Sequence, residues 1–255
     1  MGDQLSYLMQ YGLCFIVLTL VVAPVHGEVE YSVLNNAEST IGGQRFDRQV
    51  GVDYAKDTMS SATEFILKLF EQHNSTSVAA DRKNVQKVSM IVEISIHGDD
   101  VDDAAYCSNN EIHISASYIE RYSGDIKKEI IGIMYHEMTH VWQWDGNGQA
   151  PSGLIEGIAD FVRLKAGYAP LDLWVPPGGG DKWDQGYDVT ARFLDYCNSI
   201  RNGFVGELNK KMKSSYSETY FTQLLGKSVT QLWTGYKANY AASAAMLSTT
   251  TLLIN

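Results

Sequence analysis

The sequence predicts an α/β fold with an N-terminal mixed sheet and helices, a mostly helical C-terminal lobe, and a cleft between the two. Two patterns support this prediction. In the first half of the chain, short runs alternate apolar and polar side chains, as strands with one buried face do. After about residue 123, apolar residues recur three and four positions apart, which is the spacing of amphipathic helices.

Three strands and one long helix are expected in the first half. Strands are expected around Val29–Val33, over Val88–Ile96 and over Glu111–Ser117, because apolar residues occupy every second position there. Residues 53–72 carry apolar groups at helical spacing and are expected to cover one face of the sheet. His113 falls on the polar side of the third strand, so it is expected to be exposed and not to bind a metal.

Two stretches of this half are expected to be turns. Gly42 and Gly43 follow the first strand, and consecutive glycines are typical of a turn. The acidic stretch Gly98–Asp103 contains four aspartates and is expected to be a solvated turn. A calcium loop is the weaker alternative, because the ligand pattern of an EF-hand and its closing glutamate are missing.

The second half is expected to be helical. One helix begins near Ser123 or Asp125, both favourable N-caps, and ends at an Asp-Gly pair. Ser152 is expected to cap a second helix over Gly153–Ala166. Helical spacing continues through the C-terminal segment, and the weakly apolar tail after Tyr240 is expected to be a frayed end.

Length and charge bound the class of protein. The chain has 255 residues, of which 45% are hydrophobic, and a formal net charge of −10. These values predict one globular domain over residues 28–255, with lobes at roughly 28–146 and 147–245. Nucleic acids and anionic membranes are unsuitable partners, because binding them requires a basic surface.

Three features indicate a secreted protein. Residues 1–27 are expected to be a signal peptide, because the apolar run Leu13–Val22 is too short to span a bilayer. A buried strand or a membrane anchor is the alternative for this segment. Cys107 and Cys197 remain after cleavage, and an even pair favours one disulfide over two buried thiols. Asn74 begins an Asn-Ser-Thr glycosylation acceptor, which fits the same compartment.

A group of histidines and carboxylates has the spacing of a metal site. His136 and His140 lie four residues apart, with Glu137 beside the first. On a helix this spacing places both imidazoles on one face, where they can share a zinc ion. On the next helix, Glu156 and Asp160 repeat the spacing with carboxylates. Two such helices facing each other would supply His136, His140 and Glu156 as zinc ligands.

Each remaining residue of the group has a predicted role. A catalytic zinc keeps one position for water and lowers the pKa of that water to about 7. Glu137 is expected to act as general base and to pass the proton to the leaving amine. Asp160 is expected to orient a ligating histidine through its second ring nitrogen. Tyr187 follows a glycine-rich loop and is a candidate hydrogen-bond donor to the oxyanion, although a role as one of many core tyrosines is an equal alternative.

Two sequence blocks resemble a known family. The blocks HEMTHVWQWDGNGQAPSGLIEGIADFVRLKAGY and WDQGYDVTARFLDY are similar to the plant basic secretory protein family of metallopeptidases, and the similarity covers roughly Val33–Tyr240. The resemblance implies a zincin-like fold and secretion to the plant apoplast, with a role in defence and stress. It also implies that the third zinc ligand is a glutamate, which corresponds to Glu156. The chain departs from the family name because its net charge is acidic.

The resemblance also suggests how a substrate would lie. In zincins an edge strand before the metal helix pairs with an extended peptide, and Glu111–Ser117 occupies the matching place. Backbone pairing of this kind depends little on side chains. Trp174 and Trp183, in the loop that precedes Tyr187, could form the wall of a side-chain pocket or simply cover the core.

The leading hypothesis is a secreted zinc-dependent peptidase that hydrolyses peptide bonds in a peptide or protein substrate. The alternative is a secreted defence protein that binds a partner or glycan and uses zinc only structurally, since the sequence does not define a substrate pocket. A glycosidase with Glu137 and Glu156 as paired acids is weaker, because it leaves the two histidines unexplained. The sequence does not specify the oligomeric state.

Overall fold

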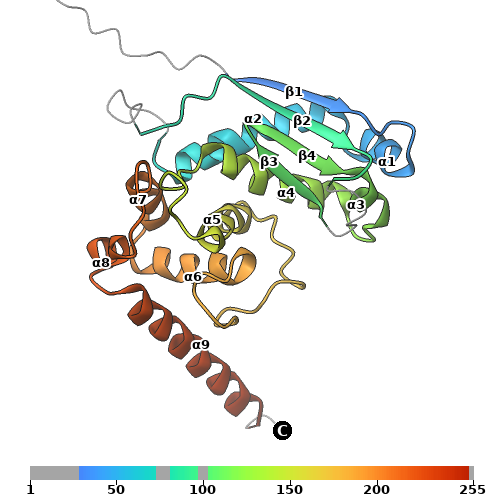
Figure 1. Ribbon diagram of the computed structural model, residues 1–255. Helices are drawn as coiled ribbons and strands as arrows, with labels where there is room; N and C mark the ends of the chain where they lie inside the picture. The colour runs from blue at the N-terminus through green and yellow to red at the C-terminus, as the bar shows by residue number, and fades with distance from the viewer. Residues whose placement is uncertain (1–28, 73–80, 97–102, 253–255) are drawn as a thin grey trace, which may run out of the picture.

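The computed structural model describes residues 29–72, 81–96 and 103–252, with side chains through residue 241. A four-stranded sheet lies over a group of helices, and further helices extend towards the C-terminus (Figure 1). The fold is therefore a mixed α/β arrangement, as predicted. Three predicted features lie outside the described residues: the signal peptide at 1–27, the glycosylation acceptor at Asn74 and most of the acidic turn at 98–103.

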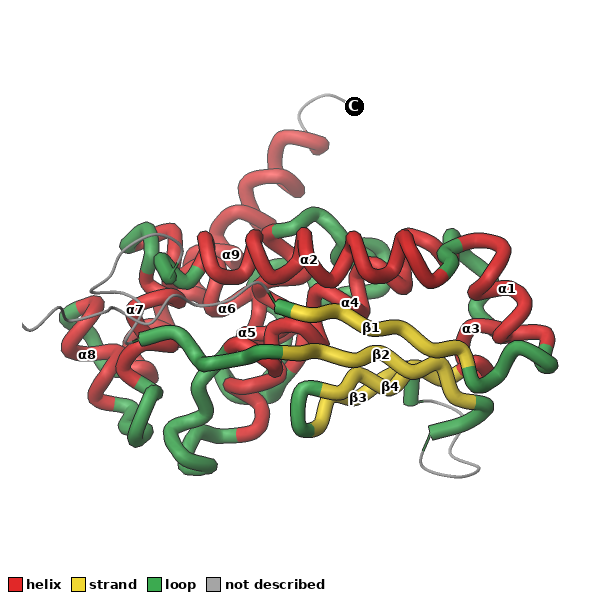
Figure 2. Tube along the Cα trace, turned by 90° about the horizontal axis from the view of Figure 1, so that it is seen from above, coloured by secondary structure: helices red, strands yellow, loops and turns green. Residues whose placement is uncertain are grey.

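The sheet is mixed, and its strands lie in the order β1-β2-β4-β3 (Figure 2). β1, β2 and β4 run parallel, and β3 pairs antiparallel with β4 at one edge. The first, second and fourth strands confirm the three predicted strands. Their bounds are as follows: β1 Glu30–Asn35, β2 Lys87–Glu93, β3 Ala105–Ser108 and β4 Glu111–Ser115.

The predicted position of the edge strand is wrong. Glu111–Ser115 lies inside the sheet between β2 and β3, so β3 forms the edge instead. Asn109 and Asn110 join the two strands and both have positive φ, at 50° and 62°. A two-residue hairpin turn requires this conformation at both central residues, and asparagine tolerates it better than most residues.

One face of the sheet is buried against helices. Met90, Ile112 and Ile114 are fully buried, and they alternate with more exposed neighbours along β2 and β4. The helices α2 (Val52–Leu69) and α4 (Ile126–Trp142) lie beneath this face (Figure 1). The helix predicted at residues 53–72 is therefore confirmed, and the period-2 pattern of the strands reflects one covered face.

The turn predicted at Gly42 and Gly43 is wrong. Both glycines are buried at the start of α1 (Ile41–Gln49), which packs against α3 (Ala116–Arg121). A Cβ atom at Gly42 would lie 1.9 Å from the carbonyl oxygen of Ala116. Gly42 therefore allows α1 and α3 to approach closely, a requirement that local sequence does not reveal.

His113 is not exposed, contrary to the prediction, because its side chain is only 12% exposed. Its Nδ1 lies 2.9 Å from a Glu93 carboxylate oxygen and its Nε2 lies 3.1 Å from a Glu111 oxygen. Its ring stacks on Tyr106 with centroids 4.4 Å apart. Neighbouring strands thus enclose this histidine on the outer face of the sheet.

Helices form the remainder of the described chain (Figure 1). Ser152, the predicted N-cap, is instead the first residue of its helix, and Pro151 precedes it without a side-chain cap. The tail predicted to fray after Tyr240 is helical to Leu252, over an alanine-rich stretch that favours helix. Within the described residues no helix is both long and apolar enough to cross a membrane. The bounds are α5 Ser152–Lys165, α6 Tyr187–Ile200, α7 Phe204–Lys211, α8 Thr219–Leu225 and α9 Val229–Leu252.

Candidate metal centre

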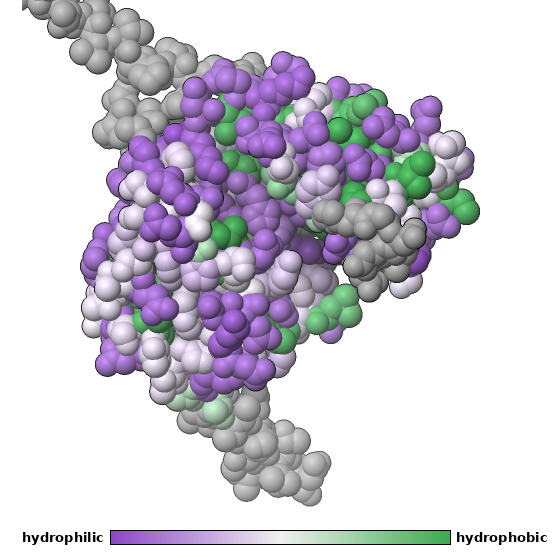
Figure 3. Space-filling view, viewed as in Figure 1, coloured by the Kyte–Doolittle hydropathy of each residue, from purple (hydrophilic) through white to green (hydrophobic). Residues whose placement is uncertain are grey.

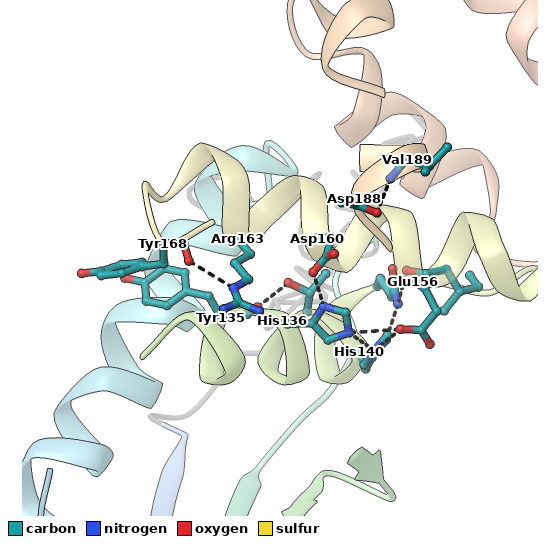
Figure 4. Close-up of polar contacts among 12 residues, drawn as sticks. Tyr135, His136, His140, Glu156, Asp160, Arg163, Tyr168, Asp188 and Val189 are labelled. Carbon is teal, nitrogen blue, oxygen red and sulfur yellow. Dashed lines mark hydrogen bonds and ion pairs between the residues drawn. The ribbon is translucent and has the colours of Figure 1, made fainter. Parts of the chain in front are cut away.

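The helix α4 carries both histidines of the site. Of the two predicted N-caps, Asp125 caps the helix, and its side chain accepts a hydrogen bond from the backbone N–H of Lys128. Most of its 17 residues are buried, because α2 and β3 pack against it as well as α5. His136 and His140 project from α4 towards Glu156 on α5 (Figure 4). The helix therefore holds its imidazoles in a rigid, largely dehydrated position.

Three potential ligand atoms converge between α4 and α5. His136 Nε2 lies 3.1 Å from His140 Nε2 and 3.1 Å from Glu156 Oε2, and His140 Nε2 lies 3.6 Å from the same oxygen. A tetrahedral zinc ion with bonds of about 2.0–2.1 Å would space its ligands about 3.4 Å apart. These three side chains form a group that could hold a metal ion, and their spacing fits zinc.

The facing imidazoles are compatible with the same fit. Two ring nitrogens 3.1 Å apart either share one proton in an N–H···N hydrogen bond or direct both lone pairs at one cation. His136 already uses its Nδ1, which lies 2.7 Å from Asp160 Oδ1. A ligating histidine commonly donates a hydrogen bond from its second ring N–H to a carboxylate in this way. Asp160 therefore lies where the sequence predicted an orienting carboxylate.

Charge is distributed unevenly over this group. Burial lowers the pKa of His136, but hydrogen bonds with Asp160 and Glu156 outweigh burial and raise it overall. Burial raises the pKa of Glu156, but its hydrogen bonds with His136 and His140 outweigh burial and bring it well below the usual range. The Glu156 carboxylate is therefore ionised at neutral pH, which a metal ligand requires.

Glu137 occupies a different environment from Glu156. Its side chain is buried beside the metal group, and its Oε2 has no hydrogen-bond partner among the described residues. Burial raises the pKa of this carboxyl, although the neighbouring His136 and His140 partly lower it. A carboxylate with a raised pKa and an unused oxygen is suited to accept a proton near neutral pH.

Tyr187 lies at the metal group and not in the core. It is 58% exposed, and its ring stacks on His136 with centroids 6.1 Å apart and planes 14° apart. It is the first residue of α6 and has φ of +44°, a conformation that costs a non-glycine residue about 1–3 kcal/mol. Burial and the nearby Glu156 raise the pKa of its phenol, so the hydroxyl keeps its proton.

Close packing of α5 against α6 holds Tyr187 in place. A Cβ atom at Gly157 would lie 2.2 Å from Thr190 Cγ2, so only glycine allows this approach. Asp188 accepts a hydrogen bond of 2.6 Å from the backbone N–H of Val175, which attaches the preceding loop to the start of α6. These contacts fix the start of α6 and therefore the position of Tyr187, the residue before Asp188.

The metal group opens into a cleft of about 880 Å³. Figure 3 shows a hollow lined by hydrophilic residues between the sheet and the C-terminal helices. Trp174 lines this cleft, whereas Trp183 packs against Phe221 with centroids 5.4 Å apart. The two tryptophans, which sequence could not separate, therefore differ: the first borders the cleft and the second covers the core.

The sequence did not predict several residues that line or support the site. The Nε2 atom of Gln143 lies 2.7 Å from His140 Nδ1. On the other side of the site, Arg163 Nη2 lies 2.8 Å from Glu129 Oε2 in a buried ion pair between α5 and α4. A polar amide three positions after His140, about one helical turn away, was the available signal for Gln143. The ion pair of Arg163 with Glu129 had no such signal in the sequence, because its two residues lie on different helices. Lys83 and Cys107 also line the cleft.

The disulfide predicted between Cys107 and Cys197 is wrong, because both cysteines are free. Cys107 lies on β3 beside the cleft, and Cys197 is buried in α6. The helices α4 and α5 lie between these two elements (Figure 1). Burial raises the pKa of both thiols, and with the nearby Glu137 it raises that of Cys107 to about 12. The alternative of two unpaired thiols is therefore the observed state.

Comparisons with known proteins identify the family of the chain. Residues 26–236 match the model of a family described as "Peptidase of plants and bacteria", abbreviated BSP. The chain belongs to this family. A basic secretory protease of Boswellia serrata is 49% identical to it over 59 residues, which cover 23% of the chain and 67% of that relative. No solved structure matches the chain. The predicted resemblance to the basic secretory family is confirmed, and membership places the chain among peptidases.

Proposed function

We propose that this BSP-family chain is a secreted zinc-dependent peptidase of the zincin type. The observation that carries the proposal is the triangle of His136, His140 and Glu156, whose ligand atoms lie 3.1, 3.1 and 3.6 Å apart at the base of a cleft. A structural zinc is usually closed by four protein ligands, whereas a catalytic zinc has three and keeps a position for water. Three such ligands beside a cleft favour catalysis.

The side chains around the triangle have separate roles in this proposal. When bound, zinc polarises the substrate carbonyl and lowers the pKa of a coordinated water. Glu137 removes a proton from the attacking water with its unused Oε2 and delivers it to the leaving amine. Tyr187 donates its phenolic hydrogen to the oxygen on which negative charge develops. Asp160 keeps the proton of His136 on Nδ1, which leaves Nε2 for the metal.

The substrate is proposed to lie along β3. This strand borders the cleft through Ala105–Cys107, and β4 is its one partner among the described strands. Its outer edge can therefore pair with the backbone of an extended peptide and align a peptide bond over the metal group. Trp174 lines the same cleft and would contact a substrate side chain. The strand that would pair with substrate is therefore β3 and not the predicted Glu111–Ser117.

Secretion and biological role rest on the relatives. The relative from Boswellia serrata carries the word secretory in its name, and the family includes plant proteins. We therefore propose secretion to the apoplast and a role in plant defence or stress. A net charge of −10 supports protein substrates over nucleic acids as partners.

The test is Glu137→Gln, assayed for hydrolysis of an unstructured protein substrate and for bound zinc. We expect zinc to be retained and hydrolysis to fall by about 10²–10⁴-fold, because the amide cannot accept the proton. Glu120→Gln, an exposed position on α3, is the matched control and should leave both unchanged. Undiminished hydrolysis by Glu137→Gln would refute the mechanism. A wild-type protein that binds zinc but neither cleaves protein nor binds a hydroxamate would favour the binding-protein alternative.

A further inference from the structure

Gln143 joins the end of α4 to the second histidine of the metal group. It follows the last residue of the helix and is 2% exposed. Its backbone N–H donates to the carbonyl of Thr139, so the residue is held close to the helix. Its amide nitrogen lies 2.7 Å from His140 Nδ1 and 3.3 Å from the carbonyl oxygen of Ile155 on α5. Its amide oxygen, Oε1, is buried and has no hydrogen-bond partner among the described residues.

This orientation of the Gln143 amide suits His140 only when no metal is bound. His140 Nε2 faces His136 Nε2 at 3.1 Å and Glu156 Oε2 at 3.6 Å, so Nε2 is the atom that would bind the metal. A neutral imidazole carries one proton, which must then lie on Nδ1. An amide NH₂ cannot accept that proton, and two donors 2.7 Å apart repel each other. The contact therefore becomes unfavourable when the metal is held.

Turning the amide over removes the conflict. The oxygen and nitrogen of a glutamine amide occupy nearly equivalent positions, and rotation by about 180° exchanges them. The exchange places the unused oxygen of Gln143 against the Nδ1–H of His140. It loses the longer contact of 3.3 Å with the Ile155 carbonyl and places the amide oxygen beside that oxygen, a weaker opposition than two donors 2.7 Å apart.

We propose that Gln143 is a positioning residue whose amide turns over when the metal binds. Without metal, its NH₂ donates to His140 Nδ1; with metal, its carbonyl oxygen accepts the Nδ1 proton and keeps Nε2 aimed at the ion. The two histidines thus have different partners, since His136 is oriented by the Asp160 carboxylate. A carboxylate only accepts hydrogen bonds, whereas an amide serves both states.

This inference rests on the proposed metal site but not on catalysis, so zinc affinity tests it. The affinity is measured by competition with a chromophoric chelator at mildly alkaline pH, where protons compete less for the imidazoles. Gln143→Met, which has similar length but no hydrogen bond, should weaken zinc binding by about 10–100-fold. Gln143→Glu, which can only accept, should bind zinc no more weakly than the wild type.

Gln72→Met is the matched control. Gln72 is also a buried glutamine, 4% exposed with an unpartnered Oε1, but its amide donates to the carbonyl of Asp81 and contacts no ligand. Its replacement should leave zinc affinity unchanged, and circular dichroism verifies that each variant is folded. If Gln143→Met does not fold, the zinc affinity of Gln143→Glu compared with that of the wild type still tests whether an acceptor is required at this position.

Two results would overturn the inference in different ways. Equal weakening by Gln143→Glu and Gln143→Met would show that the amide acts as a donor and does not turn over. Unchanged affinity in Gln143→Met would show that Gln143 does not position His140. A wild-type chain that fails to bind zinc would instead refute the proposed metal site itself, so the two failures are distinguishable.

Discussion

Replacement of Arg163 by methionine should destabilise the protein more than any exposed substitution on the same helix. The Arg163 guanidinium lies 2.8 Å from a Glu129 oxygen, and the two side chains are 10% and 9% exposed. Tyr118 donates its hydroxyl to the same carboxylate at 3.0 Å. Arg163 passes over Gly132, where a Cβ atom would lie 2.6 Å from Nε. The pair therefore connects α4 to α5 inside the protein, on the helices that carry the metal group.

The expected magnitude follows from leaving one buried charge without its partner. Breaking such a pair costs about 3–5 kcal/mol, because the remaining carboxylate has lost water as well as its counter-ion. For a chain of this size that corresponds to a fall in melting temperature of roughly 10 °C. Neutralising both groups in Arg163→Met with Glu129→Gln should recover much of the loss, because the amide oxygen still accepts from Tyr118.

The assay is urea unfolding followed by tryptophan fluorescence, in chelator, as a double-mutant cycle. Lys165→Met is the control, because Lys165 lies on the same helix as Arg163 and pairs with Asp195 of α6 at 3.0 Å, but both side chains are about 40% exposed. That exposed pair should contribute about 0–1 kcal/mol. The reasoning fails if Arg163→Met costs no more than the control, or if the double variant loses the sum of the two single losses.

Four further expectations concern the site and the cysteines. Asp160→Asn should weaken zinc binding by about 10–100-fold in chelator competition, because the amide is a poorer acceptor for His136. Tyr187→Phe should lower kcat for a peptide substrate by about 10²-fold with little change in KM, since the hydroxyl acts on developing charge. Burial raises the pKa of Glu137 above 4.5, so its ionisation costs the folded state stability as pH rises past that value. In chelator, Glu137→Gln should therefore raise the melting temperature at neutral pH and not at low pH. Unfolded without reductant, Cys107 and Cys197 should both react with a thiol reagent; in the folded chain they should react slowly, because burial raises their pKa.

Each of these expectations has a result that contradicts it. Equal zinc affinity in Asp160→Asn and in Asp195→Asn, an exposed control on α6, would remove the orienting role of Asp160. A rise in KM alone for Tyr187→Phe would indicate substrate binding without charge stabilisation. If Glu137→Gln changes the melting temperature equally at every pH, ionisation of Glu137 is not the cause of the change. A failure of both thiols to react after unfolding would restore the predicted disulfide.

Local spacing accounts for what the sequence determined by itself. His136 and His140 share a face of one helix, and Glu156 and Asp160 share a face of the next, because a helix repeats every 3.6 residues. Strands with one buried face were found by their period-2 pattern, and an amphipathic helix by its 3.6-residue pattern. These features depend on residues within one element, so the order of residues is sufficient to locate them.

The tertiary structure alone decided which elements meet. The edge position of β3 depends on strand order. This strand has only four residues, which is too short to show a clear period-2 pattern in the sequence. The pair of Arg163 with Glu129 and the approach of Tyr187 to His136 depend on the packing of α5 against α4 and α6. The separation of Cys107 from Cys197 depends on the layers between them. Such contacts join residues far apart in the chain, and burial across an interface leaves no periodic signal in either segment.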